Sequence, residues 1–207
     1  MATVIKVIPQ VVGTAIKSLV NIYTYEDMHF EEQAIRLKKL FYKYKAKRIV
    51  IDANGIGAGL VDYMVKPQND PVTGDVYPDF GVYGGTFESW DEEYRKYRTE
   101  NTEGDAMYLI KANAPINTEA HSITQNWLNA NKLQFLIDER TAKQKLLGTA
   151  KGQAMSPEDR KIYLLPYTLT GVLREEMLNL REENEGINII LKQASKKIRK
   201  DKFSASK

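Results

Sequence analysis

A carboxylate at the end of a predicted strand is the residue best placed to do chemistry. Asp52 follows the apolar, β-branched run 49–51, and the lack of alternation in that run predicts a strand covered on both faces. In α/β sheets, groups at the carboxyl ends of strands line the ligand crevice, so we expect Asp52 to face a substrate. The turn over residues 54–57 is rich in glycine. It can adopt positive φ angles, and we expect it to let a bulky substrate approach closely.

The other residue types narrow the chemistry to carboxylates. The absence of cysteine excludes disulfides and thiolate metal sites, and the two histidines, His29 and His121, lie in different predicted helices. No P-loop is present. The glycines follow the acid with the spacing G-x-G-x-G, which differs from the dinucleotide pattern G-x-G-x-x-G. Clusters of Asp and Glu bind hard divalent cations such as Mg²⁺, which support phosphodiester cleavage.

Charge is concentrated at the carboxyl end of the chain. The net charge of +3 over 207 residues is too small to imply a polyanionic partner. From residue 192 onward, however, the single acid Asp201 stands among the basic residues Lys192, Lys196, Lys197, Arg199, Lys200, Lys202 and Lys207. Such a cluster would contact phosphates in a nucleic-acid-binding protein, and a solvated basic tail is the alternative.

The remaining composition is that of an ordinary globular chain. With 43% hydrophobic residues, the chain is long enough for one well-buried domain. No apolar run approaches the roughly 20 residues needed to span a bilayer, and the start of the chain lacks the apolar region of a signal peptide. These features, together with the lack of cysteine, predict a cytoplasmic protein without a membrane segment.

The hydrophobic pattern predicts a mixture of strands and helices. Two antiparallel strands are expected at 3–8 and 17–25, further strands at 49–52, 107–111, 133–137 and 187–191, and helices near 27–44, 60–64, 118–127, 141–147 and 168–181. The first helix is expected to start at an Asp27 N-cap and to present a basic outer face made of Arg36, Lys38, Lys39 and Lys43. Gly186 is expected to follow the last helix as a stop signal.

An irregular segment over residues 67–105 interleaves aromatic and basic side chains. Trp90, Tyr94 and Tyr97 alternate with basic residues at 95, 96 and 98. This mixture is typical of surfaces that stack on or grip nucleic acid, and the alternative is a short amphipathic segment packed on the domain. We favour the packed segment.

Four segments carry a combined pattern: the hairpin at 4–25, the helix motif HFEEQAIRL at 29–37, the strand end DANGIG at 52–57, and the motif KDKFSA at 200–205. Together they resemble the C-terminal nuclease domain of the large terminase subunit of tailed bacteriophages, over most of the chain. The resemblance implies an α/β, ribonuclease H-like fold in which a mixed sheet is flanked by helices. It also implies an endonuclease that uses Mg²⁺ or Mn²⁺ to cut concatemeric double-stranded viral DNA during packaging.

The resemblance also assigns roles to individual residues. Asp52 and Asp201 correspond to the second and third catalytic, metal-binding carboxylates of the family, and the neighbouring DNA-binding residues would be Lys196, Lys197, Arg199, Lys200 and Lys202. The family's first catalytic Asp lies on a strand that precedes the hairpin. We therefore expect residues 1–207 to form a single nuclease-type domain that lacks this strand and the ATPase motor domain, is truncated at both ends and has impaired activity.

The partners implied for the full-length parent are the ATPase motor domain, the portal and the small terminase subunit. The alternative is a non-catalytic prophage remnant, or a DNA- or partner-binding module of the same fold.

Overall fold

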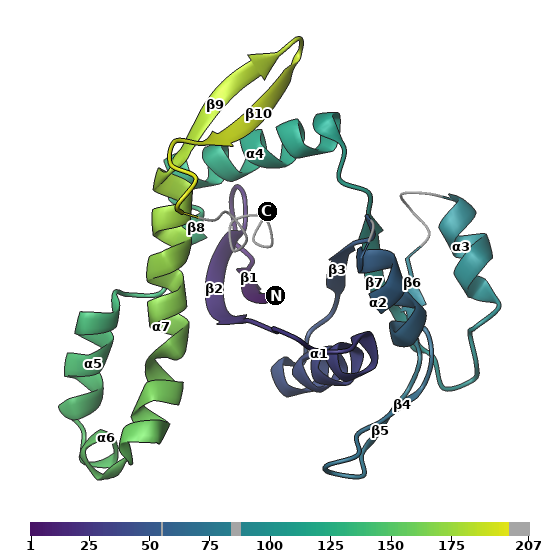
Figure 1. Ribbon diagram of the computed structural model, residues 1–207, viewed down its shortest axis with the longest axis horizontal. Helices are drawn as coiled ribbons and strands as arrows, with labels where there is room; N and C mark the ends of the chain where they lie inside the picture. The colour runs from purple at the N-terminus through teal and green to yellow at the C-terminus, as the bar shows by residue number, and fades with distance from the viewer. Residues whose placement is uncertain (55, 84–87, 199–207) are drawn as a thin grey trace. The chain divides into compact units, whose positions relative to one another are not determined.

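The computed structural model describes residues 1–54, 56–83 and 88–198 as a mixed α/β structure (Figure 1). The chain divides into two compact units. Unit 2 is the continuous segment Tyr25–Asn113, and unit 1 combines Met1–Thr24 with the chain from Ala114 onward. The α/β class expected from the sequence is confirmed at this level. The single domain over residues 1–207 stays a prediction.

Unit 2 is built around a small parallel sheet. Its elements are α1 (Phe30–Tyr44), β3 (Ile49–Asp52), α2 (Ile56–Met64), β4 (Gln68–Asn69), β5 (Val76–Tyr77), β6 (Phe80–Val82), α3 (Glu88–Arg95) and β7 (Glu103–Ile110). The sheet order is β3-β7-β6, and both neighbouring pairs are parallel. The carboxyl ends of all three strands therefore meet at one edge of the sheet.

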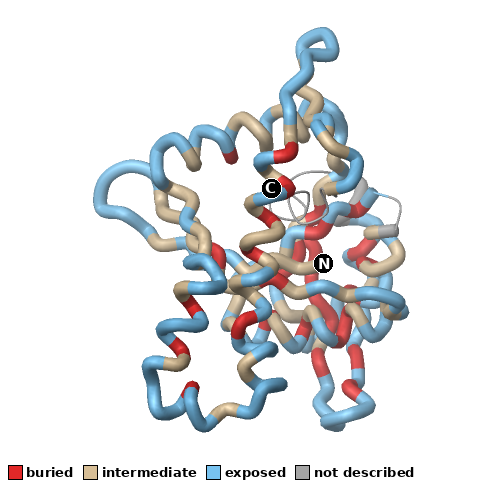
Figure 2. The backbone as a smooth tube through the Cα atoms, turned by 60° about the vertical axis from the view of Figure 1, so that its left-hand side comes forward, coloured by how far each residue is buried: buried red, intermediate tan, exposed pale blue. Residues whose placement is uncertain are grey.

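The core of unit 2 lies between this sheet and helices α1 and α2. Ile51 of β3 and Leu109 of β7 pack in one buried cluster with Ala34 and Phe41 of α1 and Val61 of α2. Buried positions such as these are red in Figure 2. The apolar spacing in α1 that predicted this helix thus supplies its buried face.

The expectation that β3 is covered on both faces is wrong for the described residues. Ile51 is buried, whereas Val50 is 62% exposed, so the strand alternates between a buried and an open face. β3 is also an edge strand, because it pairs only with β7 among the described strands. A run of β-branched residues occurs both in strands covered on two faces and in strands with one open face. The sequence therefore could not distinguish these two environments for β3.

Helix α1 departs from its predicted cap and from its predicted basic face. Its N-cap is His29, which makes no side-chain capping hydrogen bond, while Asp27 lies in the turn before it with a φ of 50°. Lys38 is fully buried instead of facing outward. Its Nζ donates to the carbonyl oxygens of Lys66 and Pro78, at 2.6 Å each. These two hydrogen bonds join the helix to the segments that lead into β4 and β6.

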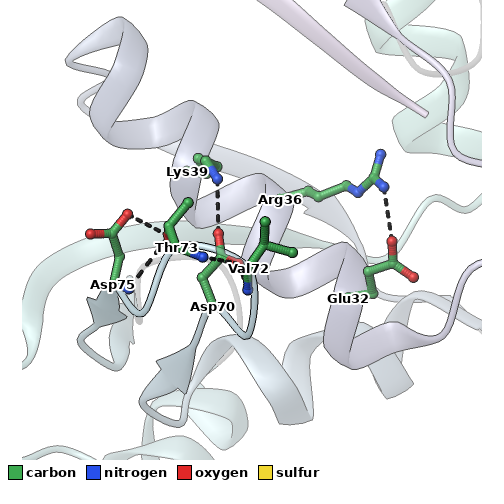
Figure 3. A network of polar contacts seen from close by, with 7 residues as sticks. All are labelled: Glu32, Arg36, Lys39, Asp70, Val72, Thr73 and Asp75. Carbon is green, nitrogen blue, oxygen red and sulfur yellow. Dashed lines mark hydrogen bonds and ion pairs between the residues drawn. The ribbon is translucent and has the colours of Figure 1, made fainter.

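A second polar contact fastens the β4–β5 hairpin to α1 (Figure 3). Lys39 Nζ lies 2.8 Å from Oδ2 of Asp70, whose side chain is almost completely buried. Oδ1 of Asp70 accepts hydrogen bonds from the backbone amides of Val72 and Thr73. The hydrogen bond from Lys39 and these amides lower the pKa of the Asp70 carboxyl to about 2. Asp70 therefore stays ionised, and it holds the hairpin turn in shape.

The aromatic and basic segment before β7 packs on the unit, as favoured from the sequence. Tyr94 is buried in the core cluster, and Tyr97 packs against it. Nη2 of Arg98 donates to the carbonyl oxygen of Val82 at 2.9 Å. The side chain of Trp90 lies outside the described residues.

Unit 1 pairs a hairpin with a helical layer. Its elements are β1 (Ala2–Ile8), β2 (Ile16–Tyr23), α4 (Ala114–Asn129), β8 (Leu133–Gln134), α5 (Glu139–Leu147), α6 (Ala150–Ala154), α7 (Pro157–Leu178), β9 (Leu180–Glu185) and β10 (Asn188–Gln193). The antiparallel β1–β2 hairpin is confirmed, and β8 adds to β2 in parallel. Leu19 and Ile22 of β2 pack against Leu173 of α7.

Several predicted boundaries in unit 1 are wrong: α4 already begins at Ala114, and β8 ends at Gln134. Helix α7 starts at Pro157, well before residue 168, because Ser156 caps it by accepting a hydrogen bond from the amide of Asp159. Gly186 is not a helix stop. It has a φ of 60° and lies in the turn between the antiparallel strands β9 and β10, where a positive φ favours glycine.

Within the three described ranges, no helix is long and apolar enough to cross a membrane. The cytoplasmic location stays a prediction.

Candidate active site at the end of β3

Asp52 occupies the position expected from the sequence, at the carboxyl end of β3, and its side chain is exposed. Its backbone lies beside that of Ile110 in β7, and the amide of Ala53 donates to the carbonyl oxygen of Ile110 at 2.8 Å. Because the two strands are parallel, the loops that follow them meet around the Asp52 carboxylate. The sheet therefore presents one rigidly mounted carboxylate at its open edge.

Two backbone amides orient this carboxylate through a single oxygen. Oδ1 of Asp52 accepts from the amide of Asn54 at 3.2 Å and from the amide of Ala112 at 3.5 Å. Nδ2 of Asn54 donates to the carbonyl oxygen of Ala112 at 2.7 Å, which ties the two loops together. Within the described part of the chain, no group donates a hydrogen bond to Oδ2. One oxygen thus positions the group, and the other is available to a ligand.

Gly57 permits the close approach of α2 to this strand end. A Cβ at position 57 would lie 1.8 Å from the carbonyl oxygen of Asp52 and 2.9 Å from its carbonyl carbon. Gly59 has a related role, since its Cβ would lie 2.7 Å from the ring of Phe30. Gly57 thus lets α2 begin directly against the end of β3, and Gly59 lets α2 pack closely on Phe30 of α1.

Gly57 does not use the positive φ that glycine permits, because it is part of helix α2 and is not among the glycines with positive φ. Gly55 lies outside the described residues. A glycine that leaves room for a substrate cannot be told in the sequence from a glycine that lets a helix pack closely. The backbone geometry at residue 57 favours the second role, close packing of α2 on β3.

Sequence reasoning missed the groups that hold Asp52. An Asp side chain commonly accepts from the amide two residues later, and the turn residues Asn54 and Gly55 follow Asp52 after one alanine, so the contact with Asn54 had a local signature in the sequence. The contact with Ala112 had no local signature in the sequence, because it joins residues 60 positions apart through a backbone amide.

The donor chemistry of Asp52 suits a hard divalent cation, which prefers carboxylate oxygen. Among residues 1–54, 56–83 and 88–198, no group of three or more His, Cys, Asp or Glu side chains is arranged to hold a metal ion. The described residues therefore do not by themselves form a complete metal site around Asp52. Asp201, the second predicted ligand, lies outside the described residues, together with Arg199, Lys200 and Lys202.

The predicted basic cluster is only partly described, and that part belongs to unit 1. Lys192 is already paired, since its Nζ lies 2.5 Å from a carboxylate oxygen of Glu183 on the neighbouring strand β9. Lys196 and Lys197 are exposed in the turn after β10. Asn179 anchors this turn at the end of α7, because its side chain donates to the carbonyl oxygen of Ser195 and accepts from the amide of Ser195.

No family model, curated protein or solved structure matches the chain. The likeness to terminase nucleases therefore rests on the four sequence motifs, and the chemistry has to be inferred from Asp52 and its surroundings.

Proposed function

We propose that the chain is a DNA endonuclease domain of the phage terminase type, with a ribonuclease H-like fold, that cleaves phosphodiester bonds of double-stranded DNA. The observation that carries the proposal is the Asp52 carboxylate. It lies at the common carboxyl edge of a parallel sheet, two backbone amides hold one of its oxygens, and its other oxygen is open. A rigidly mounted acid at such an edge is suited to organise a cleavage site.

In this proposal Asp52 and Asp201 hold Mg²⁺ or Mn²⁺. When bound, the metal would activate water and stabilise the leaving oxygen. The residues of the chain position the reaction: the amides of Asn54 and Ala112 fix the direction of the Asp52 carboxylate, and the exposed Lys196 and Lys197 would contact DNA phosphates together with Arg199, Lys200 and Lys202. In a full-length parent, the motor domain, portal and small terminase subunit would be the partners.

The test is nicking of supercoiled plasmid by the chain in Mn²⁺ and in Mg²⁺, beside Asp52→Asn. Asparagine keeps an oxygen for the two backbone amides and removes the charge, so the fold is expected to survive while the rate falls at least about 100-fold. Asp201→Asn is expected to cause a similar loss. Glu100→Gln, which changes an exposed acid elsewhere in unit 2, is the matched control and should cut at the wild-type rate.

Two results would oppose the proposal. Cleavage at the wild-type rate by Asp52→Asn would remove this residue from the mechanism. A folded wild-type chain that cuts with neither metal would leave the alternative, a non-catalytic module that binds DNA or a packaging partner.

A further inference from the structure

A helical arm, defined here as residues 138–168, projects from the hairpin layer of unit 1. It contains α5, α6 and the first half of α7 (Figure 1). Internal bonds make it rigid. Oγ1 of Thr168 donates to Glu139 at 2.9 Å, and the Arg160 guanidinium donates to the carbonyl oxygens of Gly152 and Gln153, at 3.1 and 2.6 Å. The arm is therefore a preformed surface, which lowers the entropic cost of binding a partner.

Two recesses open between the helices of the arm, and both have mainly apolar walls. One has a volume of about 440 Å³ and is lined by Leu146, Met155 and Tyr163. The other has a volume of about 500 Å³, and Leu146 again lines it, together with Leu164 and Leu165. Tyr163 and Leu165 are 44% and 45% exposed. Concave apolar surface that remains open to water is typical of binding grooves.

The rims of the recesses carry unpaired positive charge. Lys145 and Lys151 line the first recess, and Lys143 and Lys161 line the second. All four are exposed, and none makes a hydrogen bond or an ion pair with another described residue. The arm contains six basic and four acidic residues up to position 161.

Three of these four acids are occupied within the arm. Asp138 accepts from the amide of Thr141, Glu139 accepts from Thr168, and Asp159 accepts from the hydroxyl of Ser156. These hydrogen bonds orient the acids without neutralising them, so the arm carries a net charge of +2 from its six basic and four acidic residues. Glu139 lines the second recess beside its lysines, whereas the first recess has Lys145 and Lys151 and no acid in its lining.

We infer that the helical arm is a docking site for an acidic, amphipathic segment of a partner protein. Apolar side chains of such a segment would fill the recesses around Leu146. Its carboxylates would pair with Lys145 and Lys151 at the first recess and with Lys143 and Lys161 at the second. A nucleic acid backbone could use the lysines but would leave the apolar walls facing water. The combination of both features favours a protein segment, and the inference does not depend on the proposed nuclease activity.

The probe is a fluorescein-labelled 16-residue helical peptide with Leu and Phe at positions i, i+3, i+4 and i+7 and Glu on both sides of this stripe. Fluorescence anisotropy with the full chain measures its affinity. Two control peptides separate the contributions: one carries Lys in place of every Glu, and the other scrambles the same residues so that the stripe is lost. Both controls are expected to bind at least about tenfold more weakly.

Variants locate the site. Lys143→Glu combined with Lys161→Glu reverses two exposed charges at one recess and is expected to weaken peptide binding about tenfold. Leu165→Ser is expected to weaken it similarly. Lys6→Glu, at an exposed lysine on β1, is the matched control and should bind as wild type. Circular dichroism checks that each variant is folded.

Four results would overturn the inference. The acidic peptide could fail to bind, or it could bind no better than its scrambled form. The lysine variants could retain full affinity. Finally, a 20-base-pair DNA duplex could bind the wild-type arm more tightly than the peptide and lose affinity in the same lysine variants, which would identify a nucleic acid surface instead.

Discussion

The buried lysine of α1 predicts an unusual dependence of stability on pH. Burial lowers the pKa of the Lys38 ammonium from 10.5 to about 8, although the charge of Asp79 opposes part of this shift. The unfolded chain therefore binds more protons than the folded chain between these two values. Since stability rises with pH wherever the unfolded state binds more protons, this group stabilises unit 2 progressively as the pH rises from 7 towards 10.

The size of the effect follows from the two pKa values. With 10.5 in the unfolded state and about 8 in the folded state, the free energy of unfolding should increase by about 2 kcal/mol between pH 7 and pH 9.5. Lys38→Met abolishes this increase, because methionine does not titrate. It also leaves the carbonyl oxygens of Lys66 and Pro78 without their donor, at a cost of about 1–3 kcal/mol each. The variant should therefore be the less stable protein at pH 9.5.

Urea unfolding at pH 7.0 and pH 9.5 measures the difference. A Trp127→Phe background leaves Trp90 as the single tryptophan, so that fluorescence reports on unit 2. Lys43→Met, at an exposed lysine of the same helix, is the control and should follow the wild-type pH profile. If the gap between wild type and Lys38→Met stays constant to within about 0.5 kcal/mol over this range, the assigned environment of Lys38 is wrong.

Two further predictions concern residues that shape unit 2. Gly57→Ala should lower the free energy of unfolding by about 3 kcal/mol, because the new methyl group would clash with the Asp52 backbone. Gly171→Ala is the control: its methyl group would have no neighbour within 4 Å, so this variant should be as stable as the wild type or up to about 1 kcal/mol more stable. Urea unfolding measures both variants. Asp79 is buried, and although burial opposes ionisation, hydrogen bonds from two threonine hydroxyls lower its pKa below 3.8. Its contribution to stability is therefore fully present above pH 4 and is lost as the pH falls through the lowered value. In urea titrations, Asp79→Asn should cost about 2 kcal/mol at pH 7 and progressively less as the pH falls below 3.8.

Local sequence patterns were sufficient to predict several strands and helices of the fold. The two antiparallel strands, α1 and the strand that ends at Asp52 follow from apolar spacing within short segments. The same approach failed for Lys38, whose acceptors come from residues 66 and 78, far along the chain. A lysine at a predicted outer position carries no local sign that two distant carbonyl groups will enclose it.

The helix boundary at Ser156 shows a different kind of failure. Ser followed by Pro, Glu and Asp is a helix start signal in the sequence itself, but the apolar stripe further along α7 received more weight. At the candidate site, Asp52 could be predicted because a strand followed by a turn places it. The contact with the amide of Ala112 could not be predicted, because only the parallel pairing of β3 with β7 brings the loop after β7 to the Asp52 carboxylate.

The contact between Gly57 and the Asp52 backbone has a consequence for how this chain tolerates variation. The clash of any side chain at position 57 is with main-chain atoms, so no rotamer relieves it. In a library of variants screened only for folded, soluble protein, position 57 should be restricted to glycine, while position 52 should accept asparagine and other small polar residues. Under a screen for the proposed DNA cleavage, position 52 should become restricted as well. Variation at position 57 would thus report on the requirement for folding, and variation at position 52 on the requirement for the proposed chemistry.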